Sequence, residues 1–271
     1  MVTYGSPNRG EMVASVIDMW LDTYRAAGKA PGTIRNRRSY MTNFAKHISP
    51  LDATGDDLMI YLASRQDLKP ESRKSLVIAL RSFYRWAYKR GMTTEDLSVD
   101  LPSIHVPMGV PKPITDMALA RARALADPET LLMLDLGALA GLRRSEIAAV
   151  NAMDVTDQVL IVSGKGGRIR SIPIHPRLKA RLAALVGWAF PSPIRPGSHV
   201  SSDYVAARLE AVLPEPFTAH SLRHYFASKA YAGSHDIRAV QQLLGHASVE
   251  TTQRYIAIGY EAMNAAVLAV A

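Results

Sequence analysis

Residues 101–115, LPSIHVPMGVPKPIT, limit the possible folds of the chain more than any other segment. They contain four prolines and show little helical or strand periodicity. Proline fixes φ and has no backbone N–H, so such a run continues neither a helix nor a central strand. It predicts a stiff, extended linker over residues 101–114. A chain of 271 residues is long enough for a folded unit with its own core on each side of that linker.

Upstream of the linker, apolar side chains recur at helical spacing in four stretches. The first helix is expected from Glu11, the second after Thr33, the third from Thr54 with Asp57 in capping-box position, and the fourth over residues 70–91. We expect these helices to form a small bundle over residues 1–100.

Downstream of the linker, the pattern predicts helices over residues 115–126 and 128–149. The segment QVLIVSGKGGRIRSIPIH, residues 158–175, has two β-rich runs around a glycine-rich turn and predicts a hairpin. Helical patterns then dominate to the C-terminus. Residues 115–271 are therefore expected to form a mainly helical second unit with a small β hairpin.

Charge indicates a polyanionic partner, because the net charge is +8 and basic side chains release counterions when they neutralise phosphates. Charge alone leaves DNA, RNA and an acidic membrane open. Any one basic residue on a helix is usually solvated, but the grouping of several predicts a phosphate-facing surface. The residues predicted to face phosphates, and to bind DNA if that polyanion is DNA, are Arg35, Arg37, Arg38, Arg73, Lys74, Arg81 and Arg85 of the first unit.

The chain has no cysteine, which excludes disulfides, thiol nucleophiles and cysteine-ligated zinc and is compatible with a reducing cytoplasm. The start, MVTYGSPNRGEM, lacks the pattern of a signal peptide. The apolar stretch LLMLDLGALAGL is short and carries Asp135, so no membrane span is predicted.

Two motifs carry little information in isolation. Arg143 and Glu146, three residues apart in AGLRRSEIAAV, would usually form a weak surface ion pair. SGKGGRIR is no phosphate-binding P-loop, because Gly166 follows Lys165 where serine or threonine is required. At the tip of a hairpin, Lys165, Arg168 and Arg170 would instead reach a DNA groove or a phosphate, although a plain solvated turn explains them equally well.

The segment HSLRH places His220, Arg223 and His224 near one face of a helix. A zinc site is not expected, because Ser221 stands where the HExxH pattern needs glutamate and no acidic third ligand follows closely. His224 could equally be a core histidine. Taken singly, Tyr255 is compatible with an ordinary half-buried tyrosine and His246 with a helix cap.

Considered together, the motifs GLRRSE, GKGGRIRSIP, HSLRHYFAS and LGHASVETTQRY resemble the tyrosine recombinase (phage integrase) family, in the family's order and approximate spacing. The resemblance covers essentially the whole chain. It implies a mainly α fold with a small β hairpin: an N-terminal four-helix, SAM-like core-site-binding bundle and an α+β catalytic domain. One small departure is Tyr225, where the family often has threonine. The implied catalytic residues are Arg143, Lys165, His220, Arg223, His246 and Tyr255.

The resemblance also implies their roles. Tyr255 attacks a DNA phosphodiester to give a 3′-phosphotyrosyl bond, while Arg143 and Arg223 clamp the non-bridging oxygens. Lys165 protonates the 5′ leaving group, and His220 accepts the tyrosine proton. His246 hydrogen-bonds the phosphate, and Glu146 and His224 are supporting residues.

Because the phosphotyrosyl bond keeps the energy of the broken phosphodiester, no cofactor and no metal are expected. The implied function is site-specific recombination by transesterification, for integration or excision of a phage or another mobile element in a bacterial cytoplasm, at the nucleoid. The implied partners are double-stranded DNA core or attachment sites and further copies of the chain, joined as a tetramer through the C-terminal tail IAIGYEAMNAAVLAVA. An excision directionality factor or a host DNA-bending protein is a further candidate partner.

Several alternatives stay open. An Xer-type chromosome or plasmid dimer resolvase shares the motifs, and a type IB topoisomerase shares much of the chemistry. A non-catalytic DNA-binding protein on the same scaffold would not need Tyr255 or His220. The small apolar end AVLAVA also resembles a bacterial proteolysis tag. The chain starts almost directly with the bundle, so no arm-binding domain is expected.

Overall fold

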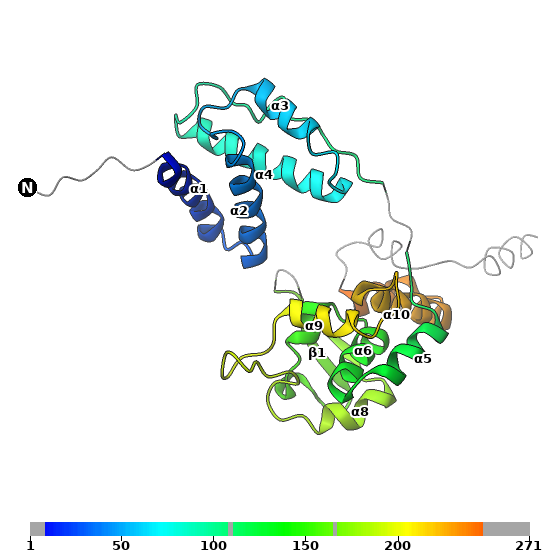
Figure 1. Ribbon diagram of the computed structural model, residues 1–271. Helices are drawn as coiled ribbons and strands as arrows, with labels where there is room; N and C mark the ends of the chain where they lie inside the picture. The colour runs from blue at the N-terminus through cyan, green and yellow to red at the C-terminus, as the bar shows by residue number, and fades with distance from the viewer. Residues whose placement is uncertain (1–8, 108–110, 165–166, 246–271) are drawn as a thin grey trace, which may run out of the picture. The chain divides into compact units, whose positions relative to one another are not determined.

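The computed structural model describes residues 9–107, 111–164 and 167–245. The chain divides into two compact units between Pro107 and Met108, inside the predicted linker (Figure 1). Within the described residues, none of the helices combines the length and the apolar character that a membrane crossing requires.

The first unit is helical, as its periodicity predicts. Its elements are α1 (Arg9–Ala26), α2 (Pro31–Ala45), α3 (Gly55–Ala63) and α4 (Pro70–Lys89). The expected capping box at the start of α3 is present: the Thr54 hydroxyl accepts from the Asp57 backbone N–H, and the Asp57 carboxylate accepts from the Thr54 N–H. α2 and α4 each have proline in the first turn, where no N–H is needed.

Aromatic side chains fill the core of this bundle. Trp20 of α1 packs edge-to-face on Phe83 of α4, with ring centroids 5.6 Å apart. Phe44 of α2 meets Tyr84 in the same manner at 6.3 Å. All four side chains are fully buried, so burial of large apolar surface accounts for the stability of the unit.

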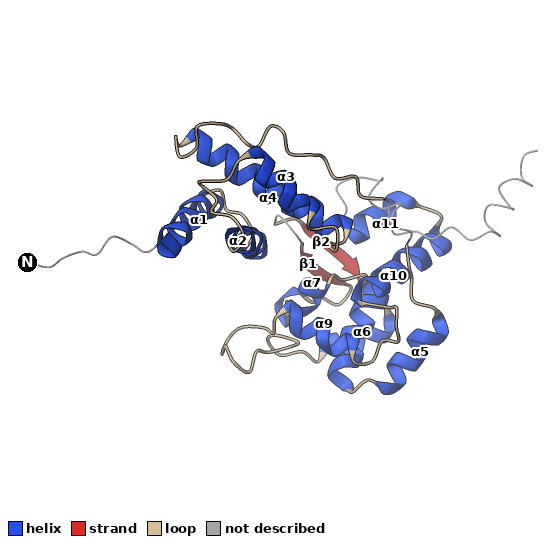
Figure 2. Ribbon diagram, turned by 45° about the horizontal axis from the view of Figure 1, so that its top comes forward, coloured by secondary structure: helices blue, strands red, loops and turns tan. Residues whose placement is uncertain are grey.

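The second unit combines helices with a hairpin (Figure 2). Its elements are α5 (Asp116–Leu125), α6 (Pro128–Ala140), α7 (Arg144–Ala148), the 3₁₀ turn η1 (Ala152–Asp154), β1 (Val159–Ser163), β2 (Ile169–Pro173), α8 (Pro176–Ala183), α9 (Ser202–Glu210), α10 (Ala219–Ser234) and α11 (Ile237–Leu244). The predicted hairpin is confirmed: β1 and β2 are antiparallel, with Val162 opposite Arg170.

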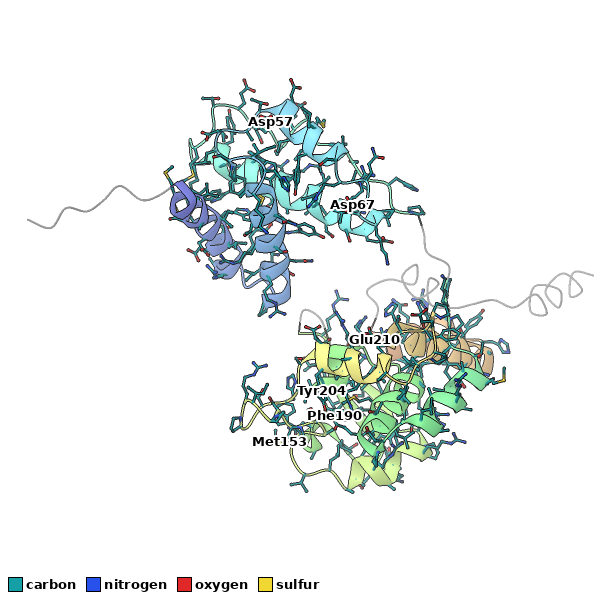
Figure 3. All side chains as sticks on the ribbon, in the orientation of Figure 1. Asp57, Asp67, Met153, Phe190, Tyr204 and Glu210 are labelled. Carbon is teal, nitrogen blue, oxygen red and sulfur yellow. The ribbon has the colours of Figure 1, made fainter. Side chains whose placement is uncertain are left out.

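α6 and α10 form the centre of the second unit. α6 is buried nearly all round, and its Gly137 lies so close to α10 that a methyl group there would be 2.9 Å from Cδ1 of Leu222. Phe190 is buried in the same core, whereas Met153 projects to the surface (Figure 3). The close approach of the two helices fixes where the residues on α10 lie relative to the end of α6.

The expectation of one helix over residues 128–149 is wrong, because the helix stops at Ala140 and a short helix restarts at Arg144. Gly141 ends α6 in the left-handed conformation, with φ +64°. The apolar pattern continues through the break because Leu142 and Ile147 still face the core. Periodicity therefore did not reveal the interruption.

A buried carboxylate ties three helices of this unit together. Asp135 of α6 accepts a hydrogen bond from Nε of Arg123 on α5 at 2.9 Å and forms an ion pair with Arg181 on α8. Its side chain is almost fully buried. The charges of Arg123 and Arg181 thus compensate the buried charge of Asp135 where α5, α6 and α8 meet.

Candidate active site

Three of the six predicted catalytic residues lie in the described part of the chain: Arg143, His220 and Arg223. Lys165, His246 and Tyr255 fall outside the described residues. The supporting residues Glu146 and His224 are described. The site can therefore be built from the elements around α7, β2, α10 and the end of α11.

Arg143 owes its position to the break after α6, because it is the residue that caps the start of α7. The Glu146 carboxylate accepts from the Arg143 backbone N–H at 2.9 Å and from its guanidinium at 2.8 Å. About a third of the Arg143 side chain is exposed, but only 3% of the Glu146 side chain. The sequence suggested a weak surface ion pair, whereas the carboxylate is in fact buried.

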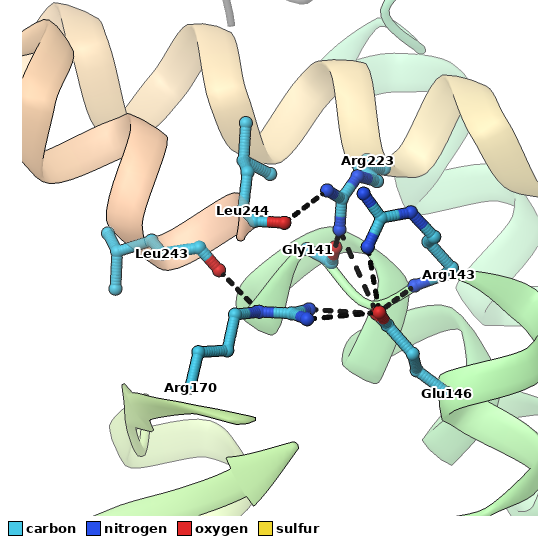
Figure 4. Close-up of polar contacts among 7 residues, drawn as sticks. All are labelled: Gly141, Arg143, Glu146, Arg170, Arg223, Leu243 and Leu244. Atoms are coloured by element: carbon cyan, nitrogen blue, oxygen red, sulfur yellow. Dashed lines mark hydrogen bonds and ion pairs between the residues drawn. The ribbon is translucent and has the colours of Figure 1, made fainter. Parts of the chain in front are cut away.

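Glu146 is the centre of a cluster of three arginines (Figure 4). Arg170 of β2 donates to both carboxylate oxygens, at 2.9 and 2.8 Å, and Arg223 of α10 lies 3.8 Å from one of them. Burial alone would raise the pKa of Glu146, but the hydrogen bonds from Arg170 and Arg143 outweigh it and hold that pKa at about 2. Glu146 is therefore a carboxylate at every pH where the protein would work.

Arg223 is the most completely buried charged residue described. Its two terminal nitrogens donate to the backbone carbonyls of Gly141 and Leu244, each at 2.5 Å. Those carbonyls stand at the ends of α6 and α11, where a helix leaves C=O groups without intrahelical partners. Arg223 thus holds two helix ends and lies beside the Glu146 charge.

Arg170 was expected to face DNA or solvent, but its side chain is buried in the second unit. Its side chain is 8% exposed, with Nε donating to the Leu243 carbonyl at 2.8 Å and both terminal nitrogens on Glu146. Arg168, two residues earlier, is exposed. The alternation of side chains along β2 could have predicted this burial, because Arg170 lies two residues before the buried Ile172 and on the same face of the strand.

The two histidines of HSLRH lie one turn apart on α10, with ring centroids 4.9 Å apart in an edge-on arrangement. Backbone and side chain taken together, His220 is exposed, and His224 is half-buried. Loss of water around the ring, together with the charges of His224, Arg223 and Arg143, lowers the pKa of His220 below its usual 6.5. His220 is then neutral at pH 7 and able to accept a proton.

A pocket of about 460 Å³ opens beside these residues. Arg143, Arg144 and His220 contribute to its wall, as do Thr218 at the start of α10 and Glu210 at the end of α9. Arg144 was not singled out from the sequence. Its side chain is 55% exposed and reaches Asp203 only at 3.8 Å, so the pocket wall carries an exposed cation beside Arg143.

The basic residues of the first unit divide into two groups. Arg37 donates to the Ser75 carbonyl at 2.8 Å, Arg38 pairs with Asp18, and Arg81 donates to the Leu101 carbonyl at 2.5 Å. These three side chains hold the bundle and its exit segment together. Arg73 is half-buried, and the exposed residues of the predicted surface are Arg35, Lys74 and Arg85.

This helical unit with a hairpin gathers three arginines around a buried carboxylate and places Arg143 and His220 in the wall of a pocket. Such a site defines an enzyme suited to phosphodiester chemistry. Residues 117–261 match the phage integrase family, and the chain belongs to that family. It is thus a tyrosine-type site-specific DNA recombinase.

The chain is 29% identical to the tyrosine recombinase XerC of Rhodospirillum centenum, over 89% of this chain and 81% of that protein. It is 28% identical to XerD of Rhizobium meliloti, over 90% and 91%. Among solved structures, the fold is similar to a lambda integrase (75–356) dimer bound to a COC′ core site, with a TM-score of 0.72, 20% identity and coverage of 88% and 96%. These similarities confirm the mainly helical recombinase fold.

Proposed function

We propose that this chain cuts and rejoins double-stranded DNA at short core sites through a 3′-phosphotyrosyl bond at Tyr255, in the integration or excision of a phage or another mobile element. The observation that carries the proposal is the cluster around Glu146, which fixes Arg143 and Arg223 on two different elements. A buried carboxylate that orients guanidinium groups preorganises positive charge at the place where the oxygens of a phosphorane would develop negative charge.

The roles divide by chemistry. Tyr255 attacks the phosphorus, its proton passes to His220, and the bond from phosphorus to the 5′ oxygen breaks as Lys165 supplies a proton to that oxygen. Arg143 and His246 stabilise the charge on the non-bridging oxygens. Arg223, which was expected to clamp these oxygens with Arg143, is fully buried beside Glu146 and adds its positive charge to the site from there. The lowered pKa of His220 supports its role as proton acceptor. Removing one such donor costs roughly 3–4 kcal/mol in comparable sites.

The partners proposed are DNA and further copies of the chain. One solved relative is a lambda integrase tetramer bound to a Holliday junction, with a TM-score of 0.69. We extend that assembly to this chain as a proposal, with the exposed residues Arg35, Lys74 and Arg85 on DNA phosphates. The tail segment expected to dock in trans, residues 256–271, lies outside the described residues. The proposed location is the bacterial nucleoid.

An Xer-type dimer resolvase is the second candidate, and one observation favours it. The XerC and XerD relatives align over most of their own lengths. The chemistry is the same in both cases, so the two candidates differ only in the DNA site that is cut.

A covalent trap tests both. The protein is incubated with nicked fragments of its source genome, denatured and digested, and the DNA left on the Tyr255 peptide is sequenced; Tyr255→Phe is the control. One inverted-repeat site on that peptide, absent from the control, would support the proposal. A site at the border of a mobile element indicates an integrase, and a single chromosomal resolution site indicates the Xer type. Tight binding with no adduct would contradict both and favour a DNA-binding protein.

A further inference from the structure

We infer that Arg170 is a positioning residue of the recombination reaction, which fastens strand β2 to the Glu146 cluster and to the end of α11. The inference rests on the proposed function, because it assigns Arg143 to the scissile phosphate. It replaces the expectation that Arg170 contacts DNA directly.

The first argument is geometric. The guanidinium of Arg170 donates three hydrogen bonds to two groups: Nε to the Leu243 carbonyl at 2.8 Å, and the two terminal nitrogens to the two oxygens of Glu146 at 2.9 and 2.8 Å. A planar fork satisfies this set, whereas a lysine ammonium is a single point charge and cannot span both acceptors.

The second argument is burial. With 8% of its side chain exposed and its charge balanced by a carboxylate that is 3% exposed, Arg170 is not available to a phosphate at the surface. Breaking such a pair would leave Glu146 charged and buried beside Arg143 and Arg223 only. Arg170 therefore keeps the carboxylate in the orientation that holds Arg143.

The third argument concerns the turn after α11. Gly245 has φ +64°, and a methyl group on it would lie 3.0 Å from Cδ of Arg170. The side chain thus packs directly under the turn that ends the helix, while Arg170 and Arg223 hold the consecutive carbonyls of Leu243 and Leu244. In the sequence, His246 follows this turn immediately.

These contacts join parts of the chain that the proposed reaction needs together. Glu146 lies on α7, Arg170 on β2, and Leu243 near the end of α11. The turn between β1 and β2 carries Lys165 in the sequence. A loss of the Arg170 contacts would let these elements shift, and a displacement of about 1 Å in an active site can cost about a hundredfold in rate.

The test uses full-length Arg170→Lys and Arg170→Gln, the first of which retains the charge if the second folds poorly. Arg123→Lys is the matched control, because Arg123 also serves a buried carboxylate of the second unit, Asp135, outside the site. Single-turnover cleavage of a nicked core-site duplex is measured at saturating protein, and the Kd for that duplex is measured separately. Amide hydrogen exchange of the peptide that covers α11 is followed without DNA.

We expect both Arg170 variants to cleave about a hundredfold more slowly at saturation, with a Kd within about twofold of the wild type and faster exchange at the end of α11. Arg123→Lys should lower the thermal midpoint but change neither the saturated rate nor that exchange.

A wild-type rate in Arg170→Lys, or unchanged α11 exchange, would overturn the inference. A raised Kd with a normal saturated rate would show instead that Arg170 contacts DNA. If the wild type itself gives no adduct, the proposed function fails, and the exchange data still decide whether Arg170 holds α11.

Discussion

The ring of Phe226 on α10 occupies the space where a side chain on Gly141 would begin: a methyl group there would lie 2.4 Å from Cδ1 of Phe226. Gly141 is thus required twice, for its φ of +64° and for the close approach of α10. This contact places the break between α6 and α7 directly over α10, so that Arg143 and Arg223 come to the same carboxylate.

Gly141→Ala should therefore destabilise the second unit strongly. The left-handed conformation costs about 1–2 kcal/mol for a residue with a Cβ, and the clash with Phe226 adds about 1–3 kcal/mol. Gly187→Ala is the matched control, because Gly187 has φ +68° but a methyl group on it would have no atom within 4 Å among the described residues. Calorimetry should show a much larger loss for Gly141→Ala. Equal losses would mean that Phe226 moves away at little cost.

Glu146 should make the stability of the second unit depend on pH. Its pKa is held at about 2, below the ordinary 4.5 that it has when unfolded. Its contribution is therefore complete above pH 4.5 and is lost as the pH falls from 4.5 toward 2. By linkage, the contribution is of the order of 3 kcal/mol.

The comparison of wild type with Glu146→Gln isolates this contribution, because other carboxylates titrate in both proteins. Denaturant unfolding at pH 7, 4.5 and 2.5 should give a difference in unfolding free energy that shrinks as the pH falls. A difference that stays constant across this range would show that the arginines do not stabilise the charged form of Glu146.

His220 should keep cleavage active at mildly acidic pH. Its pKa is lowered by the loss of water around the ring and by neighbouring cations, so the free enzyme retains the neutral base below pH 6.5. Single-turnover rates at low protein concentration report the free enzyme, and His220→Gln should reduce them by about a hundredfold or more.

The ratio of wild-type to His220→Gln rates should stay constant from pH 8 to about 6.5 and fall only below that value. Taking the ratio removes the titration of distant groups that both proteins share. A ratio that already falls above pH 6.5 would indicate a raised pKa and would exclude the neutral base proposed here.

Two arginines on α4 should behave differently when they are replaced. Arg85 is exposed, so Arg85→Ala should weaken DNA binding and reduce the slope of log K against log salt by about 0.9, with little change in stability. Arg81 donates to the Leu101 carbonyl at 2.5 Å, so Arg81→Ala should lower the thermal midpoint of the first unit. Equal changes of the salt slope in both variants would place Arg81 on the DNA as well.

Features that follow from local chemistry could be predicted from the amino-acid sequence. The Thr54 and Asp57 pair predicted the capping box at the start of α3, and two β-rich runs around a glycine-rich turn predicted the hairpin. Four motifs, in the family's order and approximate spacing, indicated the family that residues 117–261 match. These features depend on neighbours in the chain, which a sequence records directly.

Pairings between distant segments became visible in the folded chain and could not be predicted from the sequence. The break between α6 and α7 at Gly141 depends on the contact with Phe226. The burial of the Arg170 side chain depends on its hydrogen bonds to Glu146 and to the Leu243 carbonyl. An arginine looks alike in sequence whether it faces DNA or a buried carboxylate, because its partner comes from a distant segment. Desolvation and the geometry of that partner choose between the two, and both arise only when the chain is folded.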